Sequence, residues 1–315
     1  MHRLAATPGG WEPNTEGVIF IEQTPAPIIF LSAADTDIQT LAATLTNLPP
    51  QFPAIRAVNL LQLQQQLSID TYAESVLSAA QIIILRLIGG RSYWSYGLEV
   101  LKETVRETQA SLWVLPGDDR LEASLFGHST VPLETVELLW QYLSTGGTEN
   151  WSNGLKLVVN HCLNSQYQLS PPQSVPSRGI YPSPRCLDSP KVGIIFYRAH
   201  YLAGNTQPID ALCQALINKN LDPVPVFVAS LKDGEIQEFI LSEFKDTVEL
   251  ILNTTSFSII QLGLDTSQPP LDSLWQQLDV PVFQVILSST TSEQWQDSYQ
   301  GLFPRDVAIN VALPE

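Results

Sequence analysis

The sequence predicts an α/β protein of two Rossmann-like domains, each with a mostly parallel sheet flanked by helices. Three observations predict this fold class. Short apolar runs alternate with helical stretches in two separate series. The run QIIILRL, from Gln81, is apolar without alternation apart from Arg86, which is typical of a parallel strand covered on both faces. A proline-rich stretch lies between the two series.

The first series predicts a domain over residues 1–165. The spacing of its apolar residues predicts strands at 27–32, 54–60, 81–87 and 110–116, and helices at 35–47, 68–80, 96–107, 133–143 and 149–162. Asp35 is expected to cap the first helix, and Gly89 and Gly90 end the third strand. Pro116 and Gly117 are turn residues that end the fourth strand.

Residues 166–190 are expected to form a linker. The stretch from Asn164 to Pro190 holds six prolines among Ser, Gln and Gly, a composition that predicts no regular structure. A second α/β domain is predicted over 191–315, with strands at 191–197, 222–230, 249–253 and 280–287 and helices at 206–219, 234–244 and 271–278. Its last residues, FPRDVAINVALPE, stop directly after an apolar pattern, so we expect a truncated domain, although a short terminal strand would give the same pattern.

The charge of the chain excludes some partners. Lys and Arg total 16 and Asp and Glu total 32, which gives a net charge of −16 and disfavours nucleic acid and anionic lipid. Only 15% of the residues are charged, against about 25% in an average soluble protein. Either large contact areas with other domains or subunits, or Gln and Thr in place of charges on ordinary surface, would explain the deficit.

The cysteines and the chain start predict a cytoplasmic protein. Cys162, Cys186 and Cys213 are widely spaced and form no C-x-x-C pair, so neither a disulfide framework nor a thiolate metal site is expected. The first residues lack the apolar core of a signal peptide, and no apolar run reaches the roughly 18 residues needed for a membrane span.

Several catalytic motifs are absent from the sequence. It contains no G-x-x-x-x-G-K-[ST], no G-x-G-x-x-G, no G-x-S-x-G and no H-E-x-x-H, and its four histidines are not paired at helical spacing. Nucleotide-binding, hydrolase and zincin functions are therefore not supported. The acidic stretches PGDDRLE and DGEIQEFI are interpreted as helix-dipole partners, so no metal site is predicted and no catalytic residue is assigned.

Polar and aromatic side chains gather after one predicted strand of each domain. The stretch GGRSYW supplies Arg91, Tyr93 and Trp94, with Tyr96 just beyond it. Both loops are expected at the carboxyl edge of their sheets, where open α/β folds bind ligands. Arginine grips carboxylates and aromatic rings stack on planar molecules, so these residues suit a large, flat, carboxylate-bearing ligand. A tight turn whose Tyr and Trp pack on the sheet edge is the alternative.

In the second domain the stretch FYRAHYLAGNT supplies the corresponding candidates. Arg198, His200 and Tyr201 are candidate substrate-binding residues, because so dense a polar cluster is costly to bury without partners. Asn205 or Thr206 is predicted to cap the following helix, with Pro208 in its first turn.

Four long stretches carry a resemblance to a known family. These are IIFLSAADTDIQTLA (28–42), LRLIGGRSYWSYGLE (85–99), VGIIFYRAHYLAGNTQPIDALCQAL (192–216) and FPRDVAINVALPE (303–315). In this order they resemble the amino-terminal region of the cobaltochelatase large subunit, the CobN family, which is related to the magnesium chelatase large subunit. That subunit is several times longer than this chain, so the resemblance implies an amino-terminal fragment.

The resemblance implies a multisubunit ligase that forms nitrogen–metal bonds. The large subunit binds the tetrapyrrole, and AAA+ subunits bind and hydrolyse ATP with Mg²⁺, while Co²⁺ is inserted into hydrogenobyrinic acid a,c-diamide during cobalamin biosynthesis. No cofactor is expected in this fragment, which alone should be inactive. Its partners would be the corrin precursor, the remainder of the large subunit and the AAA+ subunits.

Three roles remain open for the fragment itself. It could help enclose the corrin precursor through Arg198, His200, Tyr201 and the GGRSYW loop. It could instead be a docking and gating head for subunit assembly. Without the family resemblance, a sugar- or small-metabolite-binding pair of Rossmann-like domains would fit. Only the resemblance favours cobalt over magnesium.

Overall fold

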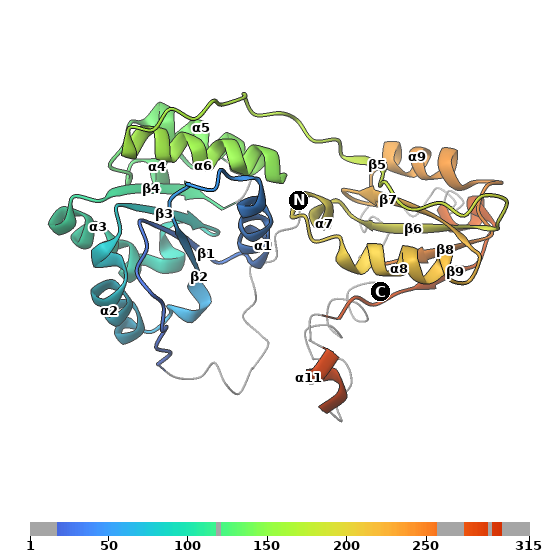
Figure 1. Cartoon of the computed structure of the whole chain (residues 1–315), viewed down its shortest axis with the longest axis horizontal. Coiled ribbons are helices and arrows are strands. Elements are labelled where there is room, and N and C mark those ends of the chain that lie inside the picture. The colour runs from blue at the N-terminus through green and yellow to red at the C-terminus, as the bar shows by residue number, and fades with distance from the viewer. Residues whose placement is uncertain (1–17, 118–120, 257–273, 289–291, 298–315) are drawn as a thin grey trace, which may run out of the picture. The chain divides into compact units, whose positions relative to one another are not determined.

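The computed structural model describes residues 18–117, 121–256, 274–288 and 292–297, and it divides into two compact units (Figure 1). The first unit holds Met1–Val175 together with Leu202–Gly204, and the second holds Pro176–Tyr201 and Asn205–Glu315. The boundary after Val175 falls inside the stretch predicted as a linker. The segment 303–315, in which a truncated end was expected, lies outside the described residues. No helix in the described ranges is long and apolar enough to cross a membrane.

The first unit is built on a parallel sheet of order β2-β1-β3-β4. Its strands are β1 (Ile28–Ser32), β2 (Ile55–Asn59), β3 (Ile82–Leu87) and β4 (Ser111–Pro116). The central strands β1 and β3 are buried along their whole length, as their continuous apolar sequences predict. Ser32 and Arg86, near the ends of these two strands, lie side by side in the register.

Helices cover both faces of this sheet (Figure 1). On one face α2 (Gln66–Ser75) and α3 (Ser95–Thr108) pack on alternate residues of the strands. The other face is covered by α1 (Asp35–Thr44), α5 (Leu133–Thr145) and α6 (Thr148–Leu163). The shorter helical segments are η1 (Leu45–Asn47), η2 (Leu60–Gln62), η3 (Leu77–Ala79), η4 (Arg91–Trp94) and α4 (Ala123–Phe126).

The second unit has a five-stranded sheet of order β5-β7-β6-β8-β9. Its strands are β5 (Arg178–Ile180), β6 (Lys191–Tyr197), β7 (Asp222–Val228), β8 (Leu250–Asn253) and β9 (Val282–Gln284). All neighbours are parallel except β5, which pairs antiparallel with β7. Its helices are α7 (Arg198–Leu202), α8 (Gln207–Ile217), α9 (Gly234–Phe244), α10 (Leu274–Leu278) and α11 (Ser292–Asp297). α9 and α10 pack on one face and α8 on the other.

The two units repeat one topology. Without β5, the second sheet reads β7-β6-β8-β9, which is the order β2-β1-β3-β4 shifted along the chain. In the first unit the chain passes from β1 to β2 on one side of β1 and then to β3 on the other side. In the second unit it passes from β6 to β7 and then to β8 in the same way. The predicted fold class, α/β with mostly parallel sheets flanked by helices, is confirmed.

Three local predictions were wrong. The predicted linker contains a strand, β5, because Gly179 lets it lie against Phe227: an added Cβ would be 2.8 Å from that ring. Asp35 is the first residue of α1, and Ala34 holds the capping position; the Asp35 carboxylate accepts from Asn59 Nδ2 at 2.7 Å. The segment after β6, predicted as a loop, forms the short helix α7.

Candidate functional site

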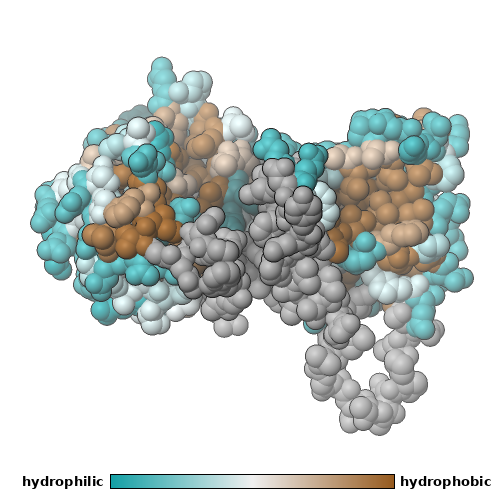
Figure 2. Space-filling model, turned by 90° about the horizontal axis from the view of Figure 1, so that it is seen from below, coloured by the Kyte–Doolittle hydropathy of each residue, from teal (hydrophilic) through white to brown (hydrophobic). Residues whose placement is uncertain are grey.

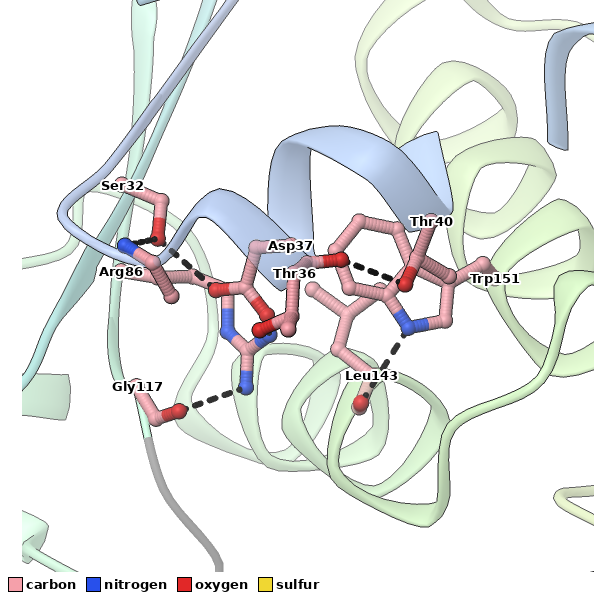
Figure 3. A network of polar contacts seen from close by, with 9 residues as sticks. Ser32, Thr36, Asp37, Thr40, Arg86, Gly117, Leu143 and Trp151 are labelled. Carbon is pink, nitrogen blue, oxygen red and sulfur yellow. Dashed lines mark hydrogen bonds and ion pairs between the residues drawn. The ribbon is translucent and has the colours of Figure 1, made fainter. Parts of the chain in front are cut away.

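A buried polar network lies where the first sheet changes direction. The chain leaves β1 toward β2 on one side and reaches β3 on the other, and ligands of doubly wound folds bind beside such points. Ser32 ends β1, Arg86 lies one residue before the end of β3, and Asp37 is in the first turn of α1 (Figure 3). The network therefore joins three elements at the carboxyl edge of the sheet.

The centre of the network is an ion pair between Arg86 and Asp37. Arg86 Nη1 lies 2.6 Å from Asp37 Oδ1, and the two side chains are 0% and 2% exposed. The Ser32 hydroxyl donates to the other carboxylate oxygen of Asp37 at 2.8 Å and accepts from the Ala34 N–H at 3.1 Å. A buried charge pair is tolerated only with such additional hydrogen bonds, because both charges have lost their water.

The far side of the guanidinium is held by the end of β4 and by α6. Arg86 Nη2 donates to the Gly117 carbonyl at 3.2 Å, and the guanidinium carbon lies 5.6 Å from the centre of the Trp151 ring. The Trp151 indole N–H donates to Leu143 O at 3.2 Å (Figure 3). Because the whole network is buried, it positions the loops that follow β1, β3 and β4 and offers no exposed group of its own.

The GGRSYW loop follows directly after this network. Gly89 and Gly90 have φ values of 86° and 73°, a region that favours glycine. Arg91 is exposed and pairs with Glu99 at 3.2 Å. Tyr93 is 39% exposed, and partial burial raises the pKa of its hydroxyl. The loop thus brings an arginine and a tyrosine to the surface, both of which stay candidates for ligand contact.

Trp94, the third candidate in this loop, is part of the core. Its side chain is 6% exposed, and its indole N–H donates to Leu63 O at 2.7 Å. Gly97 lies against it so closely that an added Cβ would be 2.2 Å from ring atoms. The contacts of Trp94 are those of the alternative stated from the sequence, a turn whose tryptophan packs on the sheet edge.

The candidates of the second unit lie on α7, just after β6. Arg198 Nε donates to Pro176 O at 2.6 Å, which fastens α7 to the start of the unit. Burial lowers the pKa of both Arg198 and His200, which for His200 favours the neutral imidazole. Arg198 therefore stabilises the position of α7, whereas the neutral imidazole of His200 can donate or accept a hydrogen bond.

Tyr201 stacks flat on Phe227 at the surface. The ring centres are 4.2 Å apart with an interplanar angle of 4°, and Tyr201 remains 37% exposed. Tyr181 meets the same tyrosine edge to face at 6.3 Å. Phe227 covers one face of the Tyr201 ring, while part of the tyrosine is open to solvent. This is an aromatic platform of the kind that planar ligands stack on.

The predicted helix cap takes a different form. Thr206 precedes the first residue of α8, but its hydroxyl accepts from Tyr181 Oη at 3.0 Å and contacts Asp210 instead of bonding a backbone N–H. The Asn205 N–H donates to His200 O at 2.9 Å, which closes the turn after α7. Both residues therefore shape the loop that carries the α7 candidates.

A second buried network fixes the end of β8. Thr254 Oγ1 donates to Ile195 O at 2.9 Å, and the Ser256 N–H donates to Tyr197 Oη at 3.0 Å. Asn253 Oδ1 accepts from Thr255 twice, from its N–H at 3.1 Å and its hydroxyl at 2.8 Å. The four residues 253–256 are 7% exposed or less. This network joins β8 to β6 at the direction change of the second sheet.

The acidic stretches show helix-end contacts where they are described. Asp233 accepts from the Glu235 N–H at 3.0 Å and caps α9. In PGDDRLE, residues 118–120 lie outside the described residues. Within the described ranges, no group of three or more His, Cys, Asp or Glu side chains is placed to hold a metal ion.

Comparison with known proteins gives the family. Residues 140–315 match the family described as CobN/Magnesium Chelatase, which is more than half of the chain. The chain belongs to this family.

Two relatives of the family match along the whole chain, and a third matches part of it. The aerobic cobaltochelatase subunit CobN of Pseudomonas aeruginosa is 36% identical, and that of a Sinorhizobium species is 34% identical, each over 100% of this chain. The magnesium-chelatase subunit ChlH of rice is 29% identical over 41% of the chain. The chain spans 26% of the length of the two CobN relatives.

A solved structure shows the same fold. The catalytic subunit of cobaltochelatase from Mycobacterium tuberculosis superposes with a TM-score of 0.70 at 24% identity, over 91% of this chain and 23% of that one. The described folds of both units are thus folds of the family.

Sequence reasoning missed most of the two buried networks. It noted Arg86 inside a strand but not its partner, and a buried arginine requires a carboxylate nearby. Asp35 and Asp37 are both in reach along the chain, and only the helix geometry decides that Asp37 faces the sheet. Residues 253–256 gave no signal, because Asn, Thr and Ser after a strand are also ordinary turn residues.

Proposed function

We propose that this chain is the amino-terminal part of the large, tetrapyrrole-binding subunit of an ATP-dependent cobaltochelatase. The complex would insert Co²⁺ into hydrogenobyrinic acid a,c-diamide in cobalamin biosynthesis, in the cytoplasm. The observation that carries the proposal is the match along the whole chain, at 36% and 34% identity, to two cobaltochelatase subunits. Co²⁺ is a substrate of this reaction, and ATP with Mg²⁺ is assigned to separate AAA+ subunits.

Metal insertion requires a base that deprotonates the pyrrole nitrogens and ligands that strip water from the ion. We assign this chemistry to the part of the large subunit outside the chain, so the chain alone is expected to be inactive. Its own contribution is recognition. Tyr201 on Phe227 offers an aromatic ring, and His200 offers a hydrogen-bonding group. In the first unit, Arg91 offers an exposed cation and Tyr93 a partly exposed ring.

The Tyr201 platform is the part of the proposed site that geometry supports best. A stacked pair presents its outer ring in a fixed plane, so a planar macrocycle loses little further side-chain freedom on binding. Arg198 contributes by holding α7 to Pro176 O, and its guanidinium carries positive charge toward the carboxylates of such a macrocycle.

Binding is tested by titrating hydrogenobyrinic acid a,c-diamide into the chain and following tryptophan fluorescence. Tyr201→Ala is expected to weaken binding by about 0.5–1.5 kcal/mol, the usual value of an aromatic pair. Phe20→Ala is the matched control, since Phe20 is an aromatic side chain that is 59% exposed and has no assigned ligand contact. Equal loss in both variants would contradict a role for the platform.

The whole proposal is tested in a hybrid large subunit. This chain replaces the matched stretch of the Pseudomonas aeruginosa subunit, and Co²⁺ insertion is measured with ATP and the partner subunits. Activity near that of the parent subunit is expected. A folded hybrid without Co²⁺ insertion would overturn the proposed function.

A further inference from the structure

The strand β9 combines a buried strand's sequence with an edge strand's position. Residues 280–287, VPVFQVIL, contain no charge and a single polar residue, the pattern of a parallel strand covered on both faces. In the described sheet β9 pairs only with β8. Phe283 is 56% exposed. The short length of β9 and Pro281 just before it protect its edge, but they leave the apolar ring of Phe283 uncovered on its face, and an exposed apolar patch marks a contact surface.

The exposed side of β9 is the side on which α8 packs. Val282 belongs to the core formed with α9 and α10, so its neighbour Phe283 points to the opposite face. Leu252 of β8 and Leu287 lie half-buried on that face, beside the core under α8. We call Leu252, Phe283 and Leu287 the β8–β9 face. Figure 2 shows a broad hydrophobic area on this side of the second unit, where α8 and β9 lie.

In the first unit the equivalent position is covered by helices. Ile84 of β3 pairs with Trp113 of β4, as Leu252 of β8 pairs with Phe283 of β9. Because the two sheets share one strand order, Trp113 and Phe283 are equivalent residues on equivalent faces. Trp113 is 0% exposed, since α5 and α6, which follow β4, pack over it.

The outer edge of β4 is also satisfied in the first unit. The Thr130 N–H donates to Leu112 O at 2.9 Å, and the Leu112 N–H donates to Thr130 Oγ1 at 2.8 Å. The Val114 N–H donates to Ser129 Oγ at 2.8 Å. Thus β4 receives hydrogen bonds along its edge and helices on its face from the chain that follows it. The β8–β9 face of the second unit is the equivalent surface, and within the described residues Phe283 is 56% exposed there.

We infer that the β8–β9 face is covered by an apolar helical segment from the part of the large subunit outside this chain. The inference rests on the proposed function. The chain spans 26% of the length of its CobN relatives, so most of the large subunit lies outside it. The occupant has an uncharged, leucine-rich stripe, because the face it meets is uncharged. A second copy pairing edge to edge along β9 would satisfy the strand but leave Leu252 and Phe283 uncovered on their face.

The test uses the 315-residue chain and, as a separate polypeptide, the part of Pseudomonas aeruginosa CobN outside the matched stretch. Their affinity is measured by calorimetry, without tetrapyrrole. Phe283→Lys is expected to weaken binding by at least about tenfold. Leu187→Lys is the matched control, since Leu187 is 80% exposed in the same unit but outside the β8–β9 face. It should bind as the unchanged chain does.

A second readout guards against misfolding. Hydrogen exchange of residues 282–287 should slow when the polypeptide binds, while that of the opposite edge strand β5 should not change. If Phe283→Lys fails to give a cooperative melt, Phe283→Ser replaces it. Unchanged affinity of the folded variant, or no complex between folded components, overturns the inference. Self-association of the chain that Phe283→Lys abolishes, with affinity for the polypeptide unchanged, would also overturn it in favour of a second copy.

The two proposals fail separately. The hybrid large subunit is compared with the same hybrid that carries Phe283→Lys. If the two insert Co²⁺ equally well and are equally stable to unfolding, the inference is wrong and the proposed function stands. If Phe283-dependent association is found but the hybrid inserts no Co²⁺, the reverse holds.

Discussion

Arg86 and Asp37 form an ion pair of 2.6 Å between side chains that are 0% and 2% exposed. It connects β3 to the first turn of α1, and the Gly117 carbonyl and the Trp151 ring complete the surroundings of the guanidinium. The pair is buried at the position where doubly wound sheets usually bind a ligand. In this protein that position is filled by the chain's own charges.

Removing one partner of this pair should be far more harmful than removing both. Asp37→Ala leaves a buried guanidinium without its carboxylate and is expected to lower the free energy of unfolding by about 3–5 kcal/mol. The double variant Asp37→Leu with Arg86→Met should recover much of this loss, because no buried charge remains. Urea unfolding followed by circular dichroism measures both.

The exposed pair of Arg91 and Glu99 provides the control for that experiment. Its side chains are 59% and 50% exposed, so Arg91→Met should change stability far less than Asp37→Ala. If the two single variants unfold at the same urea concentration, the buried pair contributes no more to stability than the exposed pair does.

The packing of Trp94 gives a second prediction. Gly97→Ala would place a Cβ 2.2 Å from the Trp94 ring, so the indole must shift and its hydrogen bond to Leu63 O is lost. We expect a loss of about 1–3 kcal/mol, as for overpacked cores. Gly127→Ala is the matched control, since its Cβ would meet its nearest neighbour at an ordinary 3.6 Å. Equal melting temperatures for the two variants would contradict a packed role for Trp94.

Much of the fold was predictable because the strands carry local information. β6 and α9 have the predicted bounds, Lys191–Tyr197 and Gly234–Phe244, since an apolar run and a helical period are both properties of neighbouring residues. β5 was not predictable. It exists because Gly179 lies against Phe227 and backbone bonds join Ser177 and Tyr181 to Ala229 and Pro225, contacts between distant parts of the chain.

The site was less predictable than the fold for a related reason. The sequence pointed to Arg198, His200 and Tyr201 as a group, but only coordinates separate their surroundings. Arg198 donates a hydrogen bond to Pro176 O, and Tyr201 stacks on Phe227, which lies 26 residues further along the chain. Trp94 and Tyr93 are neighbours in sequence, yet one is buried and the other half-exposed. The exposure of a loop side chain depends on contacts with residues that are distant in the sequence, and the composition of the loop does not reveal these contacts.

The cysteines should differ sharply in reactivity. Cys213 is 0% exposed, and burial raises the pKa of its thiol to about 11. Burial also raises the pKa of the Cys162 thiol. At about pH 8 we therefore expect Cys186, which is half-buried in a loop, to react first with a disulfide reagent, and Cys213 to react only on unfolding. Mass spectrometry of the labelled chain identifies the order, and early labelling of Cys213 would contradict the packing of α8.

The contacts of Asp222 should make the stability of the second unit depend on pH. Burial alone would raise the pKa of Asp222, but hydrogen bonds from Arg185 and from the Cys186 N–H outweigh it and lower the pKa. A carboxylate with a lowered pKa contributes stability above its unfolded value, about 3.9, and that contribution disappears as pH falls through the folded value. Asp222→Asn should therefore destabilise the chain above about pH 5, and the difference should shrink below about pH 4.

Unfolding of the wild type and of Asp222→Asn, measured across this pH range, checks the prediction. Glu238→Gln, a change at an exposed carboxylate of α9, is the control and should show no comparable dependence. Because Arg185 and Cys186 lie in the stretch predicted as a linker, the same bonds explain why that stretch is held against β7. A constant difference between wild type and Asp222→Asn from neutral pH to below the folded pKa would show that the amide loses only packing and hydrogen bonds, and that the charge of Asp222 does not stabilise the unit.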